Sequence, residues 1–315
     1  ASLGNDTQGS KSTAVGVAAL FQQNFTSATD SYNTAVGYNA GTSVTTGTNN
    51  TLIGGLAGDA ITTGGNSVAV GTAALTSATT ASDNVAVGVS ALQENTTGHS
   101  NIAISNNALL RNTTGTQNVA IGKTALSYNT TASNNTAVGH AALFANTTGT
   151  NNVAVGKDAL DSNTTGSNNT ALGVDALQAN TTASDSTALG HGALAVSTGA
   201  SNTAVGKYAL VANTTASNNV AVGKSALEAN TTGTRNNAVG AIALDANTTG
   251  SYNNAFGYNS LGGNTTGAEN VSMGDNALAS NSTGANNTAL GTSTLSFNTT
   301  ASNNTAVGHA ALNAN

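Results

Sequence analysis

The hydrophobic and polar positions of this chain repeat with a period of seventeen residues. One copy begins at Asn152, and the pattern starts again at Asn169. Each copy contains one glycine that we take as its origin, and the steps between origins depart from seventeen only twice, with values of twenty-one and sixteen. A repeat this short and regular predicts a solenoid whose units contact only their neighbours. The origins are Gly16, Gly37, Gly54, Gly71, Gly88, Ser105, Gly122, Gly139, Gly156, Gly173, Gly190, Gly206, Gly223, Gly240, Gly257, Gly274, Gly291 and Gly308.

The three residues before each origin predict a short β-strand. Position −1 is apolar in every copy, position −2 is alanine in nearly all, and position −3 is usually β-branched. Valine, isoleucine and threonine favour strands, and a strand with no charge on either face is expected to be covered on both sides. We predict that the residues at −1, such as Val36, Val155 and Val222, form a core ladder.

The residues after each origin predict a second apolar segment and a polar turn. An Ala-Leu pair ends at position +4, and leucines there, such as Leu160 and Leu227, are predicted to join the core ladder. A second strand is our preferred interpretation of this Ala-Leu limb, and one turn of helix is the alternative, because residues 224–230 have good helix propensity. Asn-Thr-Thr-Gly then supplies turn residues, although alanine replaces this glycine in some copies, as at Ala132, so a positive φ is not required there.

These segments together fit one coil of a parallel β-solenoid. We therefore predict an all-β fold, a β-roll of about eighteen seventeen-residue coils. Residues 13–315 form a single solenoid domain in this interpretation, and residues 1–12 form an irregular N-terminal segment. One coil holds little apolar volume, so we expect neighbouring chains to pack on the alanine face of the strand and add burial.

A parallel solenoid places identical residues above one another at about 4.8 Å, the spacing of paired strands. Asparagine recurs at position −4, as in Asn135 and Asn152, and at position +7, as in Asn163 and Asn230. A buried amide without a partner is costly, whereas stacked amides bond along the axis. We predict two asparagine ladders at these positions.

Composition and charge narrow the function. Only 6% of residues are charged, the net charge is −6, and the seven lysines and arginines are scattered along the sequence, so nucleic acid is not an expected partner. The chain has no cysteine and no long apolar run, which fits an extracellular protein without membrane insertion. No acid, base or nucleophile recurs in a convergent arrangement, so we expect no enzyme activity, no cofactor and no metal site.

Variable residues cluster at positions +1, +2, +5 and +6. They include Tyr38, His140, Phe144, Tyr208 and Phe297. Exposed aromatic and charged residues on a rigid scaffold are typical binding material, so this stripe is a candidate contact surface for a receptor or a host-surface glycan. The alternative interpretation is that these are solvent positions free to vary.

The consensus Asn-Thr-Ala-Val-Gly-x-x-Ala-Leu-x-x-Asn-Thr-Thr-Gly resembles the repeats of phage tail-fibre proteins and related bacterial surface proteins. Its Val/Ile-Gly steps are similar to the head repeats of trimeric autotransporter adhesins, although the period is longer here. The resemblance extends from about Thr13 to Asn315. It implies a homotrimeric left-handed β-roll that provides reach and attachment on a virion or a cell surface.

Three functions remain open at this level. The first is a structural segment of a phage tail fibre or surface adhesin. The second is the subunit of a self-assembling extracellular filament, because an uncapped solenoid end invites pairing and the sequence ends within a repeat. The third is an ice-binding solenoid, suggested by the threonine columns, although adjacent threonines such as Thr164 and Thr165 would point to opposite faces of an extended chain.

Overall fold

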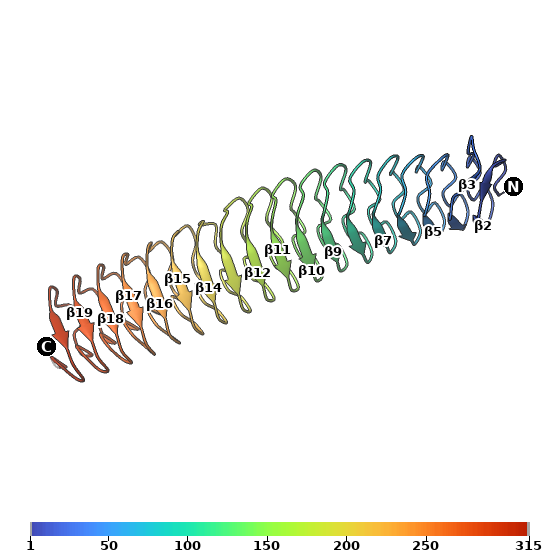
Figure 1. Ribbon diagram of the computed structural model, residues 1–315. Helices are drawn as coiled ribbons and strands as arrows, with labels where there is room; N and C mark the ends of the chain where they lie inside the picture. Colours follow the sequence, from blue (N-terminus) through green and yellow to red (C-terminus); the bar gives the residue numbers. More distant parts are fainter. Residues whose placement is uncertain (1, 314–315) are drawn as a thin grey trace. The chain divides into compact units, whose positions relative to one another are not determined.

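A computed structural model describes residues 2–313 of the chain. The chain divides into two compact units, Ala1–Lys157 and Asp158–Asn315. Each unit is a parallel β-solenoid, and in Figure 1 the coils of each unit follow one another with their strands side by side. The described residues form strands and turns but no helix, which confirms the prediction of an all-β solenoid of about eighteen coils.

The first unit contains one main sheet and one short strand pair. In the main sheet each strand pairs in parallel with the next and aligns identical repeat positions, as in Ala137 with Ala154. The short pair joins the segment before the first coil to the insertion after it. The strands of this unit are β1 (Gly9–Ser10), β2 (Thr13–Val15), β3 (Thr29–Asp30), β4 (Thr34–Val36), β5 (Thr51–Ile53), β6 (Val68–Val70), β7 (Val85–Val87), β8 (Ile102–Ile104), β9 (Val119–Ile121), β10 (Thr136–Val138) and β11 (Val153–Val155).

The second unit repeats the main sheet without a short pair among its described residues. Its strands also pair in parallel with the repeat positions aligned. This alignment holds between β13 and β14 although their coil is one residue short, because Thr187 still pairs with Thr203. The strands are β12 (Thr170–Leu172), β13 (Thr187–Leu189), β14 (Thr203–Val205), β15 (Val220–Val222), β16 (Asn237–Val239), β17 (Asn254–Phe256), β18 (Val271–Met273), β19 (Thr288–Leu290) and β20 (Thr305–Val307).

The two faces of each strand are the reverse of our prediction. The alanine at −2 points inward and is fully buried, as at Ala154, whereas the valine at −1 points outward. Val36 is 36% exposed, and Val155 and Val222 are only half-buried, so these three residues are not core residues. The buried alanine face also cannot receive a neighbouring chain.

The narrow interior explains this reversal. The +4 leucines, such as Leu160 and Leu227, are fully buried inside the coils, except in the last repeat, where Leu312 is 52% exposed. Position +4 faces position −2, because a Cβ added at Gly41, which occupies +4 in its coil, would lie 2.6 Å from Cδ1 of Leu52 at −2. One leucine per coil fills this space, so only a methyl group fits opposite it in most coils, and the β-branched side chains lie outside.

The Ala-Leu limb is neither the preferred strand nor a helical turn. Its residues form turns in which positions +2 and +4 have positive φ, with values of 54° at Asp158 and 55° at Leu160. The limb still bonds from coil to coil, since the Leu160 amide donates to the Ala176 carbonyl at 2.9 Å. A residue with a left-handed φ cannot continue a strand or a right-handed helix. The positive φ values at positions +2 and +4 therefore prevent both a strand and a helical turn in this limb.

Candidate interaction surface

The outward face of the strands is the main candidate surface. It consists of two columns, at positions −3 and −1, which we call the strand face. In the first unit the columns contain Thr13, Thr34, Thr51, Val68, Val85, Ile102, Val119, Thr136 and Val153, and Val15, Val36, Ile53, Val70, Val87, Ile104, Ile121, Val138 and Val155. In the second unit they contain Thr170, Thr187, Thr203, Val220, Asn237, Asn254, Val271, Thr288 and Thr305, and Leu172, Leu189, Val205, Val222, Val239, Phe256, Met273, Leu290 and Val307.

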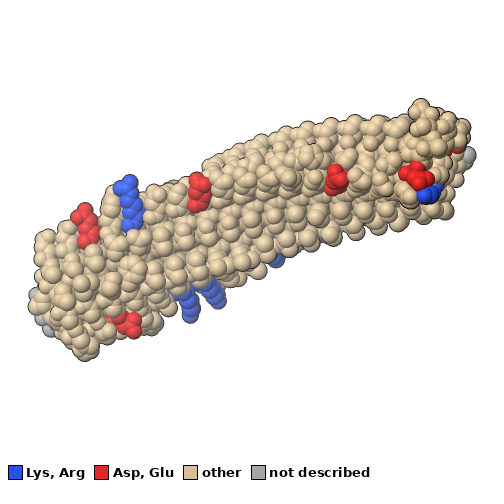
Figure 2. All heavy atoms as spheres, viewed as in Figure 1, with Lys and Arg blue, Asp and Glu red and all other residues tan. Residues whose placement is uncertain are grey.

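The strand face is free of charge in each unit: its −1 column is apolar throughout, and its −3 column mixes threonine with valine and isoleucine and has asparagine at two positions. Neither column contains an acidic or basic residue, and in Figure 2 most of the visible surface carries no charged residue. Nine coils at about 4.8 Å and three strand residues at about 3.3 Å give on the order of 400 Å² of strand face per unit. Exposed apolar patches of a few hundred Å² mark interaction sites in soluble proteins.

An asparagine ladder at position −4 holds the start of each strand in place. Asn135 and Asn152 are fully buried. The Asn152 amide N–H donates to the Asn135 Oδ1 at 2.9 Å, and the Asn135 Nδ2 donates to the Gly149 carbonyl of the turn at 2.9 Å. Each asparagine therefore links its own strand to the next coil and to a turn, which stiffens the sheet behind the strand face.

A second asparagine ladder runs at position +7. In the second unit Asn163 and Asn230 are fully buried. The Asn163 Oδ1 accepts a bond from the Asn180 Nδ2 at 2.8 Å, and the Asn230 Nδ2 donates to the Asn213 Oδ1 at 3.0 Å. Both predicted ladders are thus present as hydrogen-bonded columns, and the amides that sequence reasoning placed inside are paired along the axis.

Two asparagines interrupt the otherwise β-branched −3 column. Asn237 and Asn254 lie on consecutive strands, and the Asn237 Nδ2 donates to the Asn254 Oδ1 at 2.8 Å. Valines adjoin them in the same column, Val220 on one side and Val271 on the other. Asparagine is a poor strand former, so this pair is the clearest polar break in the strand face.

The variable residues proposed as receptor contacts lie in several coils and do not form one cluster. Tyr38 and Phe297 are 61% and 63% exposed, and His140 is also exposed. Phe144 and Tyr208 are half-buried, because each packs against an aromatic neighbour: Tyr128 lies 4.8 Å from Phe144, and His191 lies 5.3 Å from Tyr208 between ring centres. The residues supply separate aromatic contacts on the turn side of the coils.

The threonines of the turns are divided between structure and solvent. The hydroxyl of Thr164 at position +8 donates to the Thr181 carbonyl of the next coil at 3.0 Å, whereas Thr165 is exposed. The two adjacent threonines therefore differ in environment, as their adjacency predicts. In this coil Thr165 is the turn threonine left for contact with solvent or a ligand.

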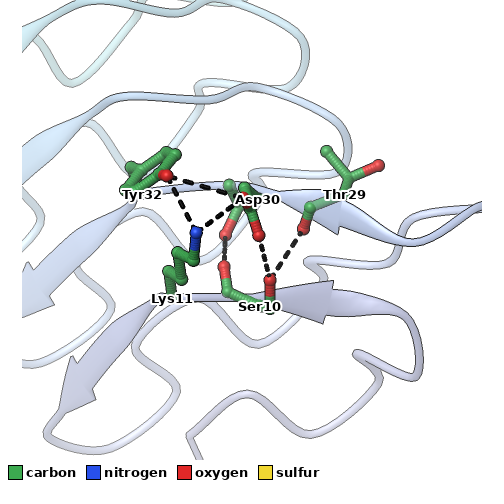
Figure 3. A network of polar contacts seen from close by, with 6 residues as sticks. Ser10, Lys11, Thr29, Asp30 and Tyr32 are labelled. Carbon is green, nitrogen blue, oxygen red and sulfur yellow. Dashed lines mark hydrogen bonds and ion pairs between the residues drawn. The ribbon is translucent and has the colours of Figure 1, made fainter.

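A polar network closes the N-terminal strand pair (Figure 3). The Lys11 Nζ lies 2.7 Å from the Asp30 Oδ2 and 3.0 Å from the Tyr32 hydroxyl, and the Ser10 hydroxyl donates to the Asp30 Oδ1 at 2.6 Å. The hydrogen bond from Lys11 is the main cause that lowers the pKa of Asp30 and, from the other side, Asp30 raises the pKa of Lys11. The network ties β1 to β3, and its exposure limits it to a modest structural role.

The described residues offer little else that could act chemically. Residues 2–313 contain no group of three or more metal-ligating side chains placed to hold an ion. No cavity forms within that range, and no helix there is long and apolar enough to span a bilayer.

Comparison with known proteins adds no identity. No protein-family model matches the chain, and a search of curated proteins finds no match.

Proposed function

We propose that this chain is a structural segment of an attachment fibre, of the phage tail-fibre or surface-adhesin kind. In this proposal three copies pack their strand faces around a common axis, outside the host cell. The uncharged strand face is the observation that carries the proposal. It takes over the role that we first gave to the alanine face, which is buried within each coil.

The area of the strand face supports self-association. The strand face of one unit, at about 400 Å², is half of the roughly 800 Å² that a stable protein interface buries on each partner, so the proposal requires both units to take part. Outward β-branched side chains lose little conformational freedom on packing, because they are already restricted at χ1. The ladders behind the strand face keep it rigid, which reduces the ordering cost of association.

Ice binding is the second candidate function, and one observation favours it. Threonine and an aliphatic residue alternate across the strand face in consecutive strands of the second unit, as in Thr187 with Leu189 and Thr203 with Val205. This regular flat array differs from the turn threonines that first suggested ice binding. A monomer with an open strand face would be required.

Light scattering during size-exclusion chromatography tests the proposal. We expect a trimer for the native chain and a monomer for the variant Val205→Glu/Val222→Glu, because it places two charges in the strand face of each copy. The matched control Thr215→Glu/Thr232→Glu adds the same charge at exposed turn positions and is expected to remain trimeric. A monomeric native chain that shapes ice crystals would favour ice binding instead, and a trimeric Val205→Glu/Val222→Glu variant would show that another surface mediates association.

A further inference from the structure

Most of the basic residues that are scattered along the sequence share one repeat position, which forms a column of side chains within each unit. Position +1 holds four of the five lysines and three of the four histidines, and its only acidic residue is Asp275. The charge of this column is therefore opposite to the net charge of the chain, which is −6. The basic members of the column are Lys123, His140, Lys157, His191, Lys207, Lys224 and His309.

Three basic residues follow one another in consecutive coils of the second unit. The Tyr208 amide donates to the His191 carbonyl at 3.0 Å, and the Ser225 amide donates to the Lys207 carbonyl at 2.9 Å. These bonds hold His191, Lys207 and Lys224 at successive steps of about 4.8 Å along the solenoid axis. All three side chains are exposed.

The two lysines of this column have no acidic partner in the described part of the chain. The ion pair found there joins Lys11 to Asp30, at the N-terminal strand pair. Two unit charges at 4 Å repel by about 1 kcal/mol even in bulk water, so a lysine column without counter-charges is mildly unfavourable by itself. An anion bound along the column would relieve this repulsion.

An aromatic ring lies beside this column, at position +2 of the Lys207 coil. The Tyr208 ring lies 5.3 Å from the His191 ring and 4.7 Å from the Lys207 Nζ. The neighbouring coil has glycine at the matching position, Gly192, where an added Cβ would lie 2.8 Å from the Tyr208 Cδ1. The absence of a side chain at Gly192 lets the tyrosine ring rest over the backbone between the cations.

We propose that His191, Lys207 and Lys224, together with Tyr208 beside them, bind a linear acidic polysaccharide that lies along the solenoid axis. The two lysines pair with carboxylate groups of the polymer, and the tyrosine supplies a flat apolar surface for a sugar ring. The described residues form no cavity, so an extended polymer fits better than a small molecule. The inference rests on the attachment role proposed above and names its ligand.

A nucleic acid fits the column less well. The duplex carries one charge per about 1.7 Å and requires a broad basic stripe, whereas this column is one side chain wide. Single-stranded nucleic acid stacks successive bases on several aromatic side chains, and this column has one tyrosine beside it. The sparse charge of an acidic polysaccharide matches the column better.

The first unit carries a second column of the same kind. Lys123, His140 and Lys157 occupy position +1 in consecutive coils, and the Ala141 amide donates to the Lys123 carbonyl at 3.1 Å. A polymer ligand can therefore find two separate sites on one chain, and removal of one column is expected to weaken binding rather than abolish it.

Binding of fluorescent polygalacturonate, measured by anisotropy at low salt, tests the proposal. We expect the native chain to bind this uronate polymer, to ignore neutral dextran, and to lose affinity as salt rises. Lys207→Gln/Lys224→Gln should weaken binding about tenfold, and adding Lys123→Gln/Lys157→Gln should abolish it. The control Arg111→Gln/Arg235→Gln removes the same charge from other columns and should change affinity less than twofold.

Three results would overturn this inference: no binding by the native chain, equal losses in the lysine and arginine variants, or tighter binding of single-stranded DNA than of polygalacturonate. Light scattering on each variant keeps the test separate from the proposed function. A lysine variant that fails to bind but remains trimeric supports both proposals. A native trimer that binds no polyanion overturns only the polysaccharide inference.

Discussion

Two stretches of the first unit build the same interior position in different ways. In the coils that start at Gly37, Gly54 and Gly71, position +7 holds Val44, Ile61 and Ala78, all fully buried. In the later coils of the unit it holds Asn95, Asn112, Asn129 and Asn146, also fully buried. We call these the apolar stretch and the amide stretch. The same backbone position therefore accepts an apolar or an amide side chain, and consecutive coils within each stretch carry side chains of the same kind.

In the amide stretch each asparagine depends on the coils before and after it. The Asn129 Nδ2 donates to the Asn112 Oδ1 at 2.9 Å and to the Ala132 carbonyl at 2.9 Å, and the Asn129 Oδ1 accepts from the Asn146 Nδ2 at 3.0 Å. These bonds are local and directional. The energy of one coil is therefore coupled to that of its neighbours.

In the apolar stretch the coils fit together through the sizes of their interior side chains. Leu52 replaces the usual alanine at −2, and Gly41 and Gly58 replace the usual leucine at +4. A Cβ at Gly58 would lie 2.8 Å from both the Ile61 Cδ1 and the Leu52 Cδ2. The large and small residues have exchanged places around one interior volume. Both glycines also occupy positions with φ near 57°, where glycine fits without strain.

The largest expected effect breaks the amide stretch. Asn129→Ala removes three buried hydrogen bonds and leaves the Asn112 Oδ1 without a partner, which alone costs about 1–3 kcal/mol, so we expect the free energy of unfolding to fall by about 3 kcal/mol. Urea unfolding followed by circular dichroism measures this change. Thr131→Ala, at an exposed position of the same turn, should change stability by less than about 0.5 kcal/mol. Equal losses of stability in the two variants would show that the asparagine ladder contributes no more than an exposed turn residue.

The next effect tests shape agreement in the apolar stretch. Gly58→Leu restores the common residue at +4 but overfills the space beside Ile61 and Leu52, which should cost about 2 kcal/mol. Adding Leu52→Ala makes room and should recover at least half of that loss, as measured by the same urea unfolding. If the two changes were simply additive, the exchange of large and small residues would not be coupled.

A smaller effect concerns the origin position that both stretches share. Ser105 replaces the glycine found at the other origins and has φ of 114°, a conformation that costs a side-chain-bearing residue about 1–3 kcal/mol. We expect Ser105→Gly to raise the unfolding free energy by about 1 kcal/mol. Thermal unfolding of the native chain and the variant measures the difference. A lower stability of the variant would mean that the serine side chain makes a favourable contact that outweighs the strain.

The smallest effect concerns pH in the apolar stretch. Burial raises the pKa of Asp59 above 3.8, because the charged carboxylate is poorly solvated beside the coil. An acid whose pKa is raised by folding adds stability at low pH and loses that contribution as pH rises through the folded pKa. The free energy of unfolding should therefore increase slightly as the pH falls from 7 to 4, and this increase should be smaller in Asp59→Asn. Unfolding midpoints across this range measure the trend, and an identical pH dependence in Asp59→Asn would contradict it.

The period and the amide ladders are predictable because they depend only on which residue stands above which. Parallel stacking follows from the seventeen-residue repeat. A buried asparagine needs a hydrogen-bond partner, and the asparagine at the same position of the neighbouring coil supplies it. The side of the strand that faces inward is not predictable in the same way. Neither Val155 nor Ala154 is charged, so polarity does not separate the faces, and the interior width that excludes valine depends on Leu160 across the coil.

Two further features needed the backbone. The left-handed φ of residues such as Leu160 decides that the Ala-Leu limb is a turn, and leucine gives little warning of it. The substitutions Gly41 and Gly58 are the available signal, because glycine marks positions of positive φ. The lysine column also has a signal in the sequence: numbering each repeat from its glycine places Lys207 and Lys224 at one position, although they are seventeen residues apart.

The coil between β13 and β14 has a practical consequence. It is one residue short, yet Thr187 and Thr203 remain paired, so the turns absorb a change of length that a strand would not tolerate. Deletion of one residue inside a turn therefore leaves the strands of the neighbouring coils paired in register. Loss or duplication of a whole repeat would change the length of a solenoid unit in increments of about 4.8 Å while preserving the contacts between coils. Length can then evolve separately from the chemistry of the surface.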